Sequence, residues 1–488
     1  MSSRSFDVLL ISIGNGVNLL VNFLTVPYLV RMLSYDDYGS YGQVLLIVNL
    51  LKEIFSYSLH VICNNFYAVK KHPPDKIFSN LMVLLGFLAI IASCFMLLIT
   101  PYVSTALGNT NLHNLLIVSL LNLLFQIPFP VLYSTLVFYG KAKKASVIIV
   151  VSNVIRIALM LLAIQVYNSV WLMMIGLSLA SFIQFVIFYF AIPAELRKFS
   201  RPDKALLKTL FLAASPLVLT AVFERAVYYL DGLMISVMTS TKEYALYRAG
   251  AFEVPFISVI FGYVSAVVMP ELARLYVRRE TGLIIELKKK AISYSAFIIY
   301  PVLIYLLFFS YPLVTFYLSE KYARSAGIFT IFCFSLLLRI NDYQDVMITY
   351  GRIKILMLNM IWMVALNIII NYFLILSFGI EGSAVAFVLH LLTFAIVLSF
   401  FNSKILGCRI GEVYDFRVFG RILILSLITV IPVWAIYNWL LPQVWFLITM
   451  APVYVLSVYY IGVKRNIIDG SIFSQILNKV TGFRNSNK

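Results

Sequence analysis

The sequence predicts an all-α, polytopic membrane protein with about fourteen transmembrane helices. Of its 488 residues, 62% are hydrophobic and only 12% are charged, which leaves too little polar surface to cover a soluble globule. Many apolar runs exceed the roughly 20 residues that cross the hydrocarbon core as a helix, and the alternating segments of membrane strands are not seen. Two short phrases also recur in the same order, which is typical of repeated helix bundles.

Each expected span is a long apolar run bounded by a short polar connection. In order, the spans are expected at approximately Phe6–Leu29, Tyr41–Cys63, Ile77–Val103, Leu115–Tyr139, Ala145–Val166, Val170–Ala191, Leu206–Leu230, Tyr244–Leu272, Ala291–Tyr317, Ala326–Tyr350, Ile355–Leu376, Gly382–Phe401, Phe419–Leu440 and Val444–Val463.

The internal repeat defines the expected domain organisation. The phrase Met32–Tyr41 is echoed at Met238–Tyr247, and Tyr139–Lys143 is echoed at Tyr350–Lys354. Because six expected spans separate the first two copies, both lie on the same side, so the halves form a parallel repeat. We therefore expect two six-helix lobes and an added pair of helices, with the boundaries 1–194 for the N-lobe, 195–208 for a cytoplasmic linker, 209–405 for the C-lobe and 406–488 for the added pair and tail.

The distribution of charge predicts the orientation in the membrane. The formal net charge is +17, but the basic residues lie in short connections instead of one stripe or tail, which argues against a nucleic-acid partner. Most of them fall in alternate connections and in both tails, whereas the opposite set holds only Arg31, Lys242, Lys321 and Arg324. By the positive-inside rule, both termini are cytoplasmic.

The sequence lacks the patterns of metal sites and common catalytic sites. The four cysteines show no C-x-x-C spacing and the four histidines are isolated, so neither a metal site nor a disulfide framework is indicated. There is no phosphate-binding loop and no arrangement of nucleophile and base. We expect no catalytic residues, no cofactor and no enzymatic activity.

A polar stripe follows the first span. Asn15, Asn18 and Asn22 are spaced by three and four residues, which places them on one face of a helix. Two interpretations stay open. The stripe forms hydrogen bonds between helices, or it lines a hydrated cavity that receives a polar headgroup.

Charged residues within the spans are the remaining candidates, because each needs a partner or a wet cavity. In the tenth span, Arg339, Asp342 and Asp345 are expected along one helix face, and an ion pair between Arg339 and Asp342 is at least as good an account as a substrate role. Arg156 has no acid near it in sequence, which favours a cavity. The basic candidates are Lys52, Arg156, Arg225, Arg248 and Arg339, and the acidic ones are Glu53, Glu224, Asp231 and Glu253.

Two six-helix lobes, an added helix pair and the phrase Arg31–Tyr41 resemble the multidrug/oligosaccharidyl-lipid/polysaccharide (MOP) exporter superfamily, and within it the Wzx-type O-antigen flippases. The resemblance implies a flippase of the bacterial inner membrane that moves undecaprenyl-pyrophosphate-linked oligosaccharides to the periplasmic leaflet by alternating access. A polysaccharide polymerase and a chain-length regulator are further expected partners. The basic candidates, with Asn15, Asn18 and Asn22, would line the cavity, and the acidic ones are candidates for proton or sodium coupling.

Two relatives within the superfamily remain alternatives. Lipid II flippases carry basic residues on the cavity face of the first helix, whereas this chain has no Arg or Lys between Arg4 and Arg31. Drug and cation antiporters often hold a carboxylate in the early helices. Here there is none between Asp7 and Asp36, which leaves Glu53 as the main candidate for antiport.

Overall fold

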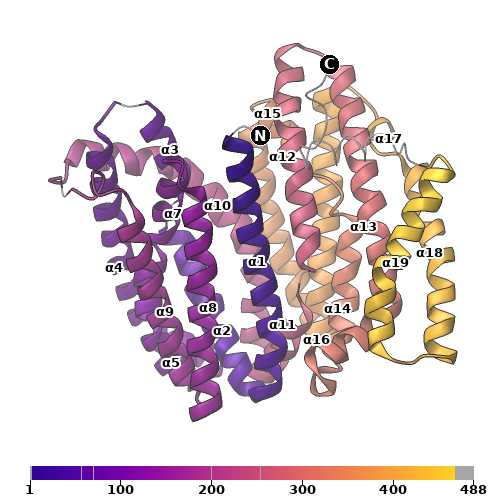
Figure 1. Ribbon diagram of the computed structural model, residues 1–488, viewed down its shortest axis with the longest axis horizontal. Helices are drawn as coiled ribbons and strands as arrows, with labels where there is room; N and C mark the ends of the chain where they lie inside the picture. Colours follow the sequence, from indigo (N-terminus) through magenta and orange to yellow (C-terminus); the bar gives the residue numbers. More distant parts are fainter. Residues whose placement is uncertain (1–2, 57, 70, 199, 253, 468–488) are drawn as a thin grey trace. The chain divides into compact units, whose positions relative to one another are not determined.

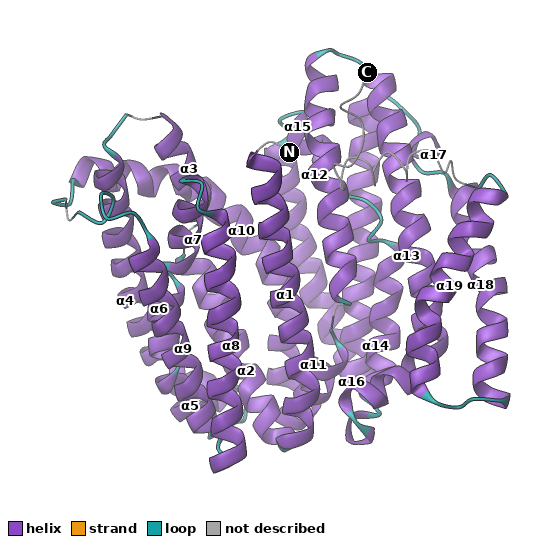
Figure 2. Ribbon diagram, in the orientation of Figure 1, coloured by secondary structure: helices purple, strands orange, loops and turns teal. Residues whose placement is uncertain are grey.

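The computed structural model describes residues 3–56, 58–69, 71–198, 200–252 and 254–467. Throughout these residues the secondary structure is helical, without strands, as Figure 2 shows. The prediction of an all-α fold is confirmed. The chain divides into two compact units, Met1–Ala249 and Gly250–Lys488, which are described separately below.

The N-terminal unit is drawn from indigo to magenta in Figure 1. Its core is built where α7 and α9 pack together, with Leu132, Leu136 and Phe188 fully buried. The helices are α1 (Ser3–Met32), α2 (Tyr35–Phe55), α3 (Leu59–Val69), α4 (Pro74–Ala106), α5 (Leu112–Val118), α6 (Leu120–Gln126), α7 (Phe129–Phe138), α8 (Ala142–Tyr167), α9 (Val170–Ala191), α10 (Lys204–Met238) and α11 (Thr241–Gly250).

The C-terminal unit contains the longest helices. Its core includes Tyr305 and Phe309 of α13, which pack against Tyr454 and Val458 of α19. The helices are α12 (Pro255–Val277), α13 (Thr281–Leu318), the short η1 (Glu320–Tyr322), α14 (Ser325–Cys333), η2 (Phe334–Leu337), α15 (Asp345–Thr349), α16 (Ile353–Leu406), α17 (Ile410–Val413), α18 (Phe416–Trp439) and α19 (Val444–Lys464).

Most of the expected spans correspond to single helices, and breaks explain the rest. The 54-residue α16 is bent at Gly379, whose φ of 61° and ψ of −139° interrupt the helix between the eleventh and twelfth spans. The second span is divided into α2 and α3, the fourth into α5, α6 and α7, and the eighth into α11 and α12. Among the described residues, nine helical stretches are long and apolar enough to cross a membrane, when α2 with α3, α6 with α7, and the whole of α16 are each counted as one.

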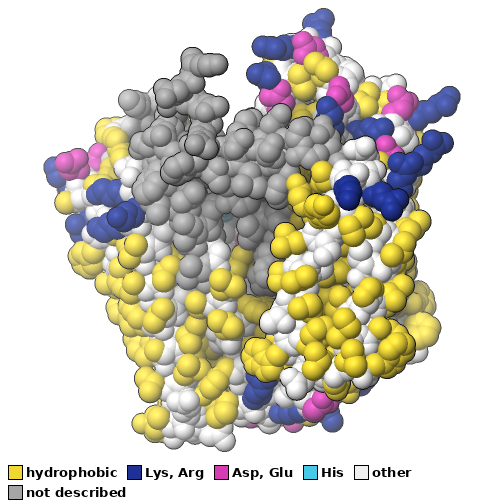
Figure 3. Space-filling view, turned by 45° about the vertical axis from the view of Figure 1, so that its right-hand side comes forward, with side chains coloured by type: hydrophobic (Ala, Val, Ile, Leu, Met, Phe, Trp, Pro, Cys, Tyr) yellow, Lys and Arg dark blue, Asp and Glu magenta, His cyan; other side chains and the backbone are white. Residues whose placement is uncertain are grey.

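The surface agrees with a membrane environment. Where Figure 3 colours the face by residue type, apolar side chains cover its middle, and lysine and arginine gather toward its top and bottom. Large apolar side chains such as Leu98, Leu376 and Trp439 are strongly exposed. Such a surface is stable in contact with lipid.

The tenth span differs from the prediction. Between η2 and α15, residues 338–344 form turns and bends instead of a continuous helix. Arg339, Asp342 and Asp345 therefore do not follow one helix face, and that expectation was wrong. Backbone of this kind is tolerated at membrane depth only where protein or water satisfies its polar groups.

The two copies of the first repeated phrase have the same local structure. Ser34 Oγ accepts a hydrogen bond from Asp37 N at 3.0 Å, and Ser240 Oγ accepts one from Glu243 N at 3.2 Å. In each copy, a serine thus satisfies an otherwise unpaired backbone N–H at the start of a helix, α2 or α11, and an acid lies in the first turn.

The second repeated phrase also forms the same turn twice. Gly140 has a φ of 72° and Gly351 a φ of 68°, conformations that glycine adopts without steric cost. Lys141 N and Arg352 N each donate to the carbonyl oxygen five residues earlier, at 3.1 and 2.8 Å. Both helices therefore end in a Schellman-type cap.

The compact units do not divide the chain where the repeat does. Helix α10 packs on α2, α3 and α4, so it belongs with the N-terminal helices. The division expected from the repeat concerns internal symmetry and stays a prediction. It comprises lobes at 1–194 and 209–405, a linker at 195–208 and an added segment at 406–488.

Candidate functional site

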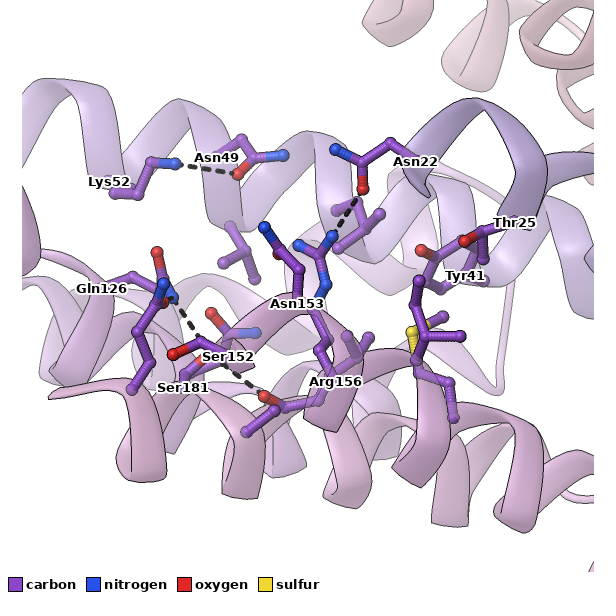
Figure 4. Close-up of a pocket in the computed structure, with 18 of the residues that line it drawn as sticks. Asn22, Thr25, Tyr41, Asn49, Lys52, Gln126, Ser152, Asn153, Arg156 and Ser181 are labelled. Carbon is purple, nitrogen blue, oxygen red and sulfur yellow. Dashed lines mark hydrogen bonds between the residues drawn. The ribbon is translucent and has the colours of Figure 1, made fainter. Parts of the chain in front are cut away.

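The N-terminal unit encloses a cavity of about 580 Å³. Helices α1, α2, α6, α7, α8, α9 and α11 all contribute to its lining. Figure 4 shows polar side chains from several of these helices pointing into one space. The cavity brings together residues that lie up to 226 positions apart, from Asn22 to Arg248.

Three of the basic side chains that the structure describes line this cavity. Arg156 of α8 donates from its guanidinium to Asn22 Oδ1 of α1 at 2.5 Å, and Lys52 Nζ lies 3.4 Å from Asn49 Oδ1 on α2 (Figure 4). The guanidinium carbon of Arg248 lies 5.7 Å from the centre of the Tyr41 ring. Amide and aromatic groups orient these cations without cancelling their charge.

Arg248 occupies a slot that exists because residue 42 is a glycine. A Cβ atom at Gly42 would lie 2.6 Å from Arg248 Cδ and 2.8 Å from Tyr244 Cε1. Among the described residues, Arg248 Nε has no hydrogen-bond partner although it is buried. The two residues occupy matching positions after the two copies of the repeated phrase. At this equivalent position, the first copy has a glycine that leaves room, and the second has the arginine that fills it.

The repeated phrases also contact each other next to the cavity. Gly39 packs directly on Thr241, where a side chain on residue 39 would meet the Thr241 backbone oxygen. Lys242 Nζ lies 5.2 Å from the centre of the Tyr35 ring. These contacts join the start of α2 to the start of α11.

Neutral polar groups form the rest of the polar lining. Gln126 Nε2 of α6 donates to Ser181 Oγ and to Gln184 Oε1 of α9, at 3.2 and 3.0 Å. No aspartate or glutamate lies among the lining residues that the structure describes. The amide residues on the lining are Asn22, Asn49, Asn122, Gln126, Asn153 and Gln184.

The structure brings together four of the predicted binding residues, namely Asn22, Lys52, Arg156 and Arg248. It places Arg339 in the C-terminal unit, with its guanidinium carbon 6.0 Å from the centre of the Phe387 ring. Three predicted binding residues, Asn15, Asn18 and Arg225, have side chains that lie outside the described part of the structure.

The predicted coupling acids are not part of the described cavity lining. Glu53 is half-buried near the end of α2, and Asp231 is 3% exposed within α10. Glu253 and the side chain of Glu224 lie outside the described residues. Within the described part of the chain, no group of three or more His, Cys, Asp or Glu side chains could hold a metal ion.

Sequence reasoning missed the glutamines of the cavity. Gln126 and Gln184 each lie in an otherwise apolar run, and a polar side chain in a membrane span is itself a signal of function or of helix contact. Neither glutamine is charged or part of a regular stripe, and the two lie on different helices 58 positions apart, so no local pattern connects them.

Comparison with known proteins gives both a family and a fold. A family model described as "Polysaccharide biosynthesis protein" matches residues 28–327. No curated protein matches the chain. The structure is similar to the lipid II flippase MurJ in an inward closed conformation, with a TM-score of 0.75 and 16% identity over 94% of this chain and 100% of that one.

Two further solved structures have a similar fold. An inward-facing multidrug resistance transporter of the MATE family and MOP superfamily gives a TM-score of 0.62 and 14% identity, covering 81% of this chain and 94% of that one. A MOP superfamily transporter from Pyrococcus furiosus gives 0.58 and 14% identity, covering 83% and 95%. At these identities the similarity shows the fold alone. It confirms the predicted resemblance to this superfamily and its helical architecture.

Proposed function

Because this chain belongs to the polysaccharide biosynthesis protein family and has the multi-pass fold of MOP superfamily flippases and transporters, we propose that it flips a lipid-linked oligosaccharide. The proposed substrate is an undecaprenyl-pyrophosphate-linked repeat unit, such as that of O-antigen. Its diphosphate and sugars enter the cavity while the polyprenyl chain stays in the bilayer. In this account the protein is a transporter without a catalytic step.

The observation that carries the proposal is the charge of the cavity. Lys52, Arg156 and Arg248 line it, and the described lining holds no carboxylate. Arginine stays charged and can donate two parallel hydrogen bonds, which suits the oxygens of a diphosphate. In a site of reduced polarity, the attraction between such charges is stronger than in water.

The orientation follows from the asymmetry of basic residues along the sequence. We place the protein in the bacterial inner membrane with both termini cytoplasmic, so that the substrate is loaded from the cytoplasm and released on the periplasmic side. A polysaccharide polymerase and a chain-length regulator would act on the released product, and they are proposed partners.

The lining of the cavity also bears on the alternatives. A cationic drug would meet three basic side chains and no described carboxylate, so drug antiport is disfavoured by like-charge repulsion. Lipid II carries the same diphosphate, so flipping of lipid II agrees equally well with the cations. Transport of lipid II in place of an oligosaccharide repeat unit would decide for that alternative.

Energy coupling is part of the proposal. An inward gradient of protons or sodium ions would act through Glu53, Glu224, Asp231 or Glu253, since moving one charge across the membrane supplies about 2.3 kcal/mol per 100 mV. Flipping in vesicles should then stop when an ionophore removes one of the two gradients. Undiminished flipping without either gradient would contradict coupling.

The main test is complementation of a strain that lacks its own repeat-unit flippase. Arg156→Ala and Arg248→Ala should each lower glycan export at least tenfold, which corresponds to about 1.4 kcal/mol, at normal protein level. Arg156→Lys should retain part of the activity because it keeps the charge but loses the planar fork.

A matched control is Arg324→Ala in the C-terminal unit. The Arg324 guanidinium binds the Glu381 carboxylate through Nε at 2.9 Å and a terminal nitrogen at 3.0 Å. This arginine is already neutralised, so its loss should change export little. Full export by both cavity variants would refute the assignment of the cations.

A further inference from the structure

The cavity wall formed by α6, α7 and α9 has a chemistry different from that of the cationic residues. We propose that Gln126, Phe129, Tyr133, Ser181 and Gln184 form a saccharide subsite, which recognises uncharged sugar hydroxyls and selects among glycans. This inference rests on the proposed function, and it assigns selectivity to residues other than the cations.

The aromatic part of the subsite is held rigidly. Phe129 and Tyr133 lie one turn apart on α7, with ring centres 6.5 Å apart, and both line the cavity. Phe188 of α9, which is fully buried, packs edge-on against Phe129 at 5.0 Å and lies 6.4 Å from Tyr133. Rings fixed in this way offer apolar faces to the C–H surface of a sugar at little cost in conformational entropy.

The amide part has a defined direction. The Gln126 amide nitrogen donates to Ser181 Oγ and Gln184 Oε1, so both of its N–H groups are used. Within the described part of the chain, no partner holds Gln126 Oε1 or Gln184 Nε2. The wall therefore presents an acceptor from one glutamine and a donor from the other, which together match a hydroxyl group that both donates and accepts.

A buried hydroxyl nearby points independently to a polar ligand. Ser152 of α8 lines the same cavity and is 3% exposed, and its Oγ has no hydrogen-bond partner among the described residues. A buried polar group without a partner is unfavourable, because the hydrogen bonds that it made to water are not replaced. A ligand hydroxyl that binds Ser152 would remove that cost.

The two parts of the cavity divide the recognition of one substrate. The cations come from α2, α8 and α11, and they attract any diphosphate regardless of the sugar attached. The amides and rings come from α6, α7 and α9, and they carry no charge. A site built to hydrogen-bond a hydroxyl discriminates strongly against an analogue that lacks it, because the polar groups of the site are then left unpaired.

The test compares two lipid-linked repeat units that share the undecaprenyl diphosphate and differ in one sugar hydroxyl. Both are supplied to proteoliposomes that contain the full-length protein, and the ratio of their flipping rates is measured. Gln184→Ala should change this ratio by about five- to tenfold, as expected for the loss of one hydrogen bond.

Gln184→Glu separates recognition from helix packing. A glutamate at 184 still accepts the hydrogen bond from Gln126 Nε2, so the contact between α6 and α9 is kept. It replaces the donor that faces the ligand with an acceptor, so the ratio should again change. If both Gln184 variants keep the wild-type ratio, these amides only pack helices together and the subsite is refuted.

Two controls distinguish this inference from the proposed function. Arg156→Ala should slow both substrates by the same factor and leave the ratio unchanged. If it has no effect while the Gln184 variants alter the ratio, the role of the cations fails and the subsite stands. Gln443→Ala, an exposed amide between α18 and α19, should alter neither the rates nor the ratio.

Discussion

In the N-terminal unit, Arg156 and Arg248 meet amide and aromatic groups, whereas in the C-terminal unit Lys288 is enclosed by oxygen atoms that include a carboxylate. Lys288 Nζ lies 2.5 Å from Asp345 Oδ2, 2.5 Å from Asn341 Oδ1 and 3.0 Å from the Asp342 carbonyl oxygen. Its side chain is 4% exposed. All three N–H groups of the ammonium are thus used, and its charge is neutralised within the protein.

The polar cluster around Lys288 connects several elements of its unit. Asn341 Nδ2 donates to the Tyr414 hydroxyl at 2.7 Å, and this hydroxyl lies 2.7 Å from Ser399 Oγ of α16. Ser265 of α12 donates to Asp342 Oδ2 at 3.0 Å. The cluster therefore satisfies the Asp342 carbonyl oxygen of the interrupted backbone and ties this segment to neighbouring helices.

The surroundings of a buried basic residue therefore indicate its role. Where a carboxylate and carbonyl oxygens surround the cation, as at Lys288, it stabilises the fold. Where a cavity is lined by cations and amides with no described carboxylate, as at Arg156, the charge is available to an anionic ligand. The following experiments test this contrast.

The largest expected effect is on the stability of the C-terminal unit. Asp345→Ala leaves the Lys288 ammonium buried without its carboxylate, which should lower the free energy of unfolding by about 3–5 kcal/mol. The melting temperature in detergent should fall strongly. Arg156→Ala should leave it nearly unchanged because that guanidinium faces the cavity. An Asp345→Ala protein as stable as the wild type would show that the ion pair of Lys288 does not stabilise the fold.

A smaller effect is expected where Arg248 enters its slot. Gly42→Ala puts a methyl group 2.6 Å from Arg248 Cδ, and overpacking of this kind costs about 1–3 kcal/mol. Displacement of the guanidinium should lower glycan export as well as the melting temperature. Gly86→Ala on α4, where an added Cβ meets nothing within 4 Å, is the control and should alter neither. Normal export by Gly42→Ala would show that the position of Arg248 is not critical.

The equivalent caps of the two units should respond equally. Gly140→Ala and Gly351→Ala each force an alanine into a left-handed conformation, at a cost of about 1–2 kcal/mol. In both cases the added Cβ would meet no atom within 4 Å, so only backbone strain contributes. Similar decreases in melting temperature would show that the two caps are equivalent, whereas a large difference would show that they contribute unequally to stability.

The smallest effect concerns two aspartates that cap helices outside the membrane. A hydrogen bond from Lys76 and the backbone N–H groups at the start of α10 hold the pKa of Asp203 below its ordinary value. Burial acts to raise the pKa of Asp415, but the bonds from Lys289 and from Val418 N outweigh it, so this pKa is also lowered.

Since the folded pKa lies below the unfolded one, each aspartate stabilises the fold at neutral pH. This contribution is lost as the pH falls below about 4 and through the folded pKa. Asp203→Asn and Asp415→Asn should therefore lower the melting temperature slightly at pH 7 and progressively less at acid pH. A difference from the wild type that stays constant down to pH 3 would exclude this role of the charge.

Much of the fold could be predicted because its causes are local. Apolar runs set the spans, and Ser34, Ser240, Gly140 and Gly351 mark helix ends through hydrogen bonds and backbone angles that involve only near neighbours. The same reasoning placed Arg156 in a cavity, since no acid lies close to it in sequence.

Lys288 shows the limit of local patterns. Because it stands beside Lys289 and Lys290, the sequence alone predicts three similar basic residues. In the structure it lies inside α13 and is buried. Its neutralising carboxylate is 57 positions away in sequence, so no local pattern could reveal that this lysine, unlike its two neighbours, is enclosed.

Local patterns in the sequence are enough to predict a helical membrane protein, because hydrophobic runs and helix-capping residues act over a few turns. Which polar residues share a site depends on the tertiary structure alone. Asn22 meets Arg156 across 134 positions, and Gln126 meets Gln184 across 58. Such contacts depend on how the helices pack, and the same arginine or glutamine would serve equally well in an ion pair, a helix contact or a ligand site.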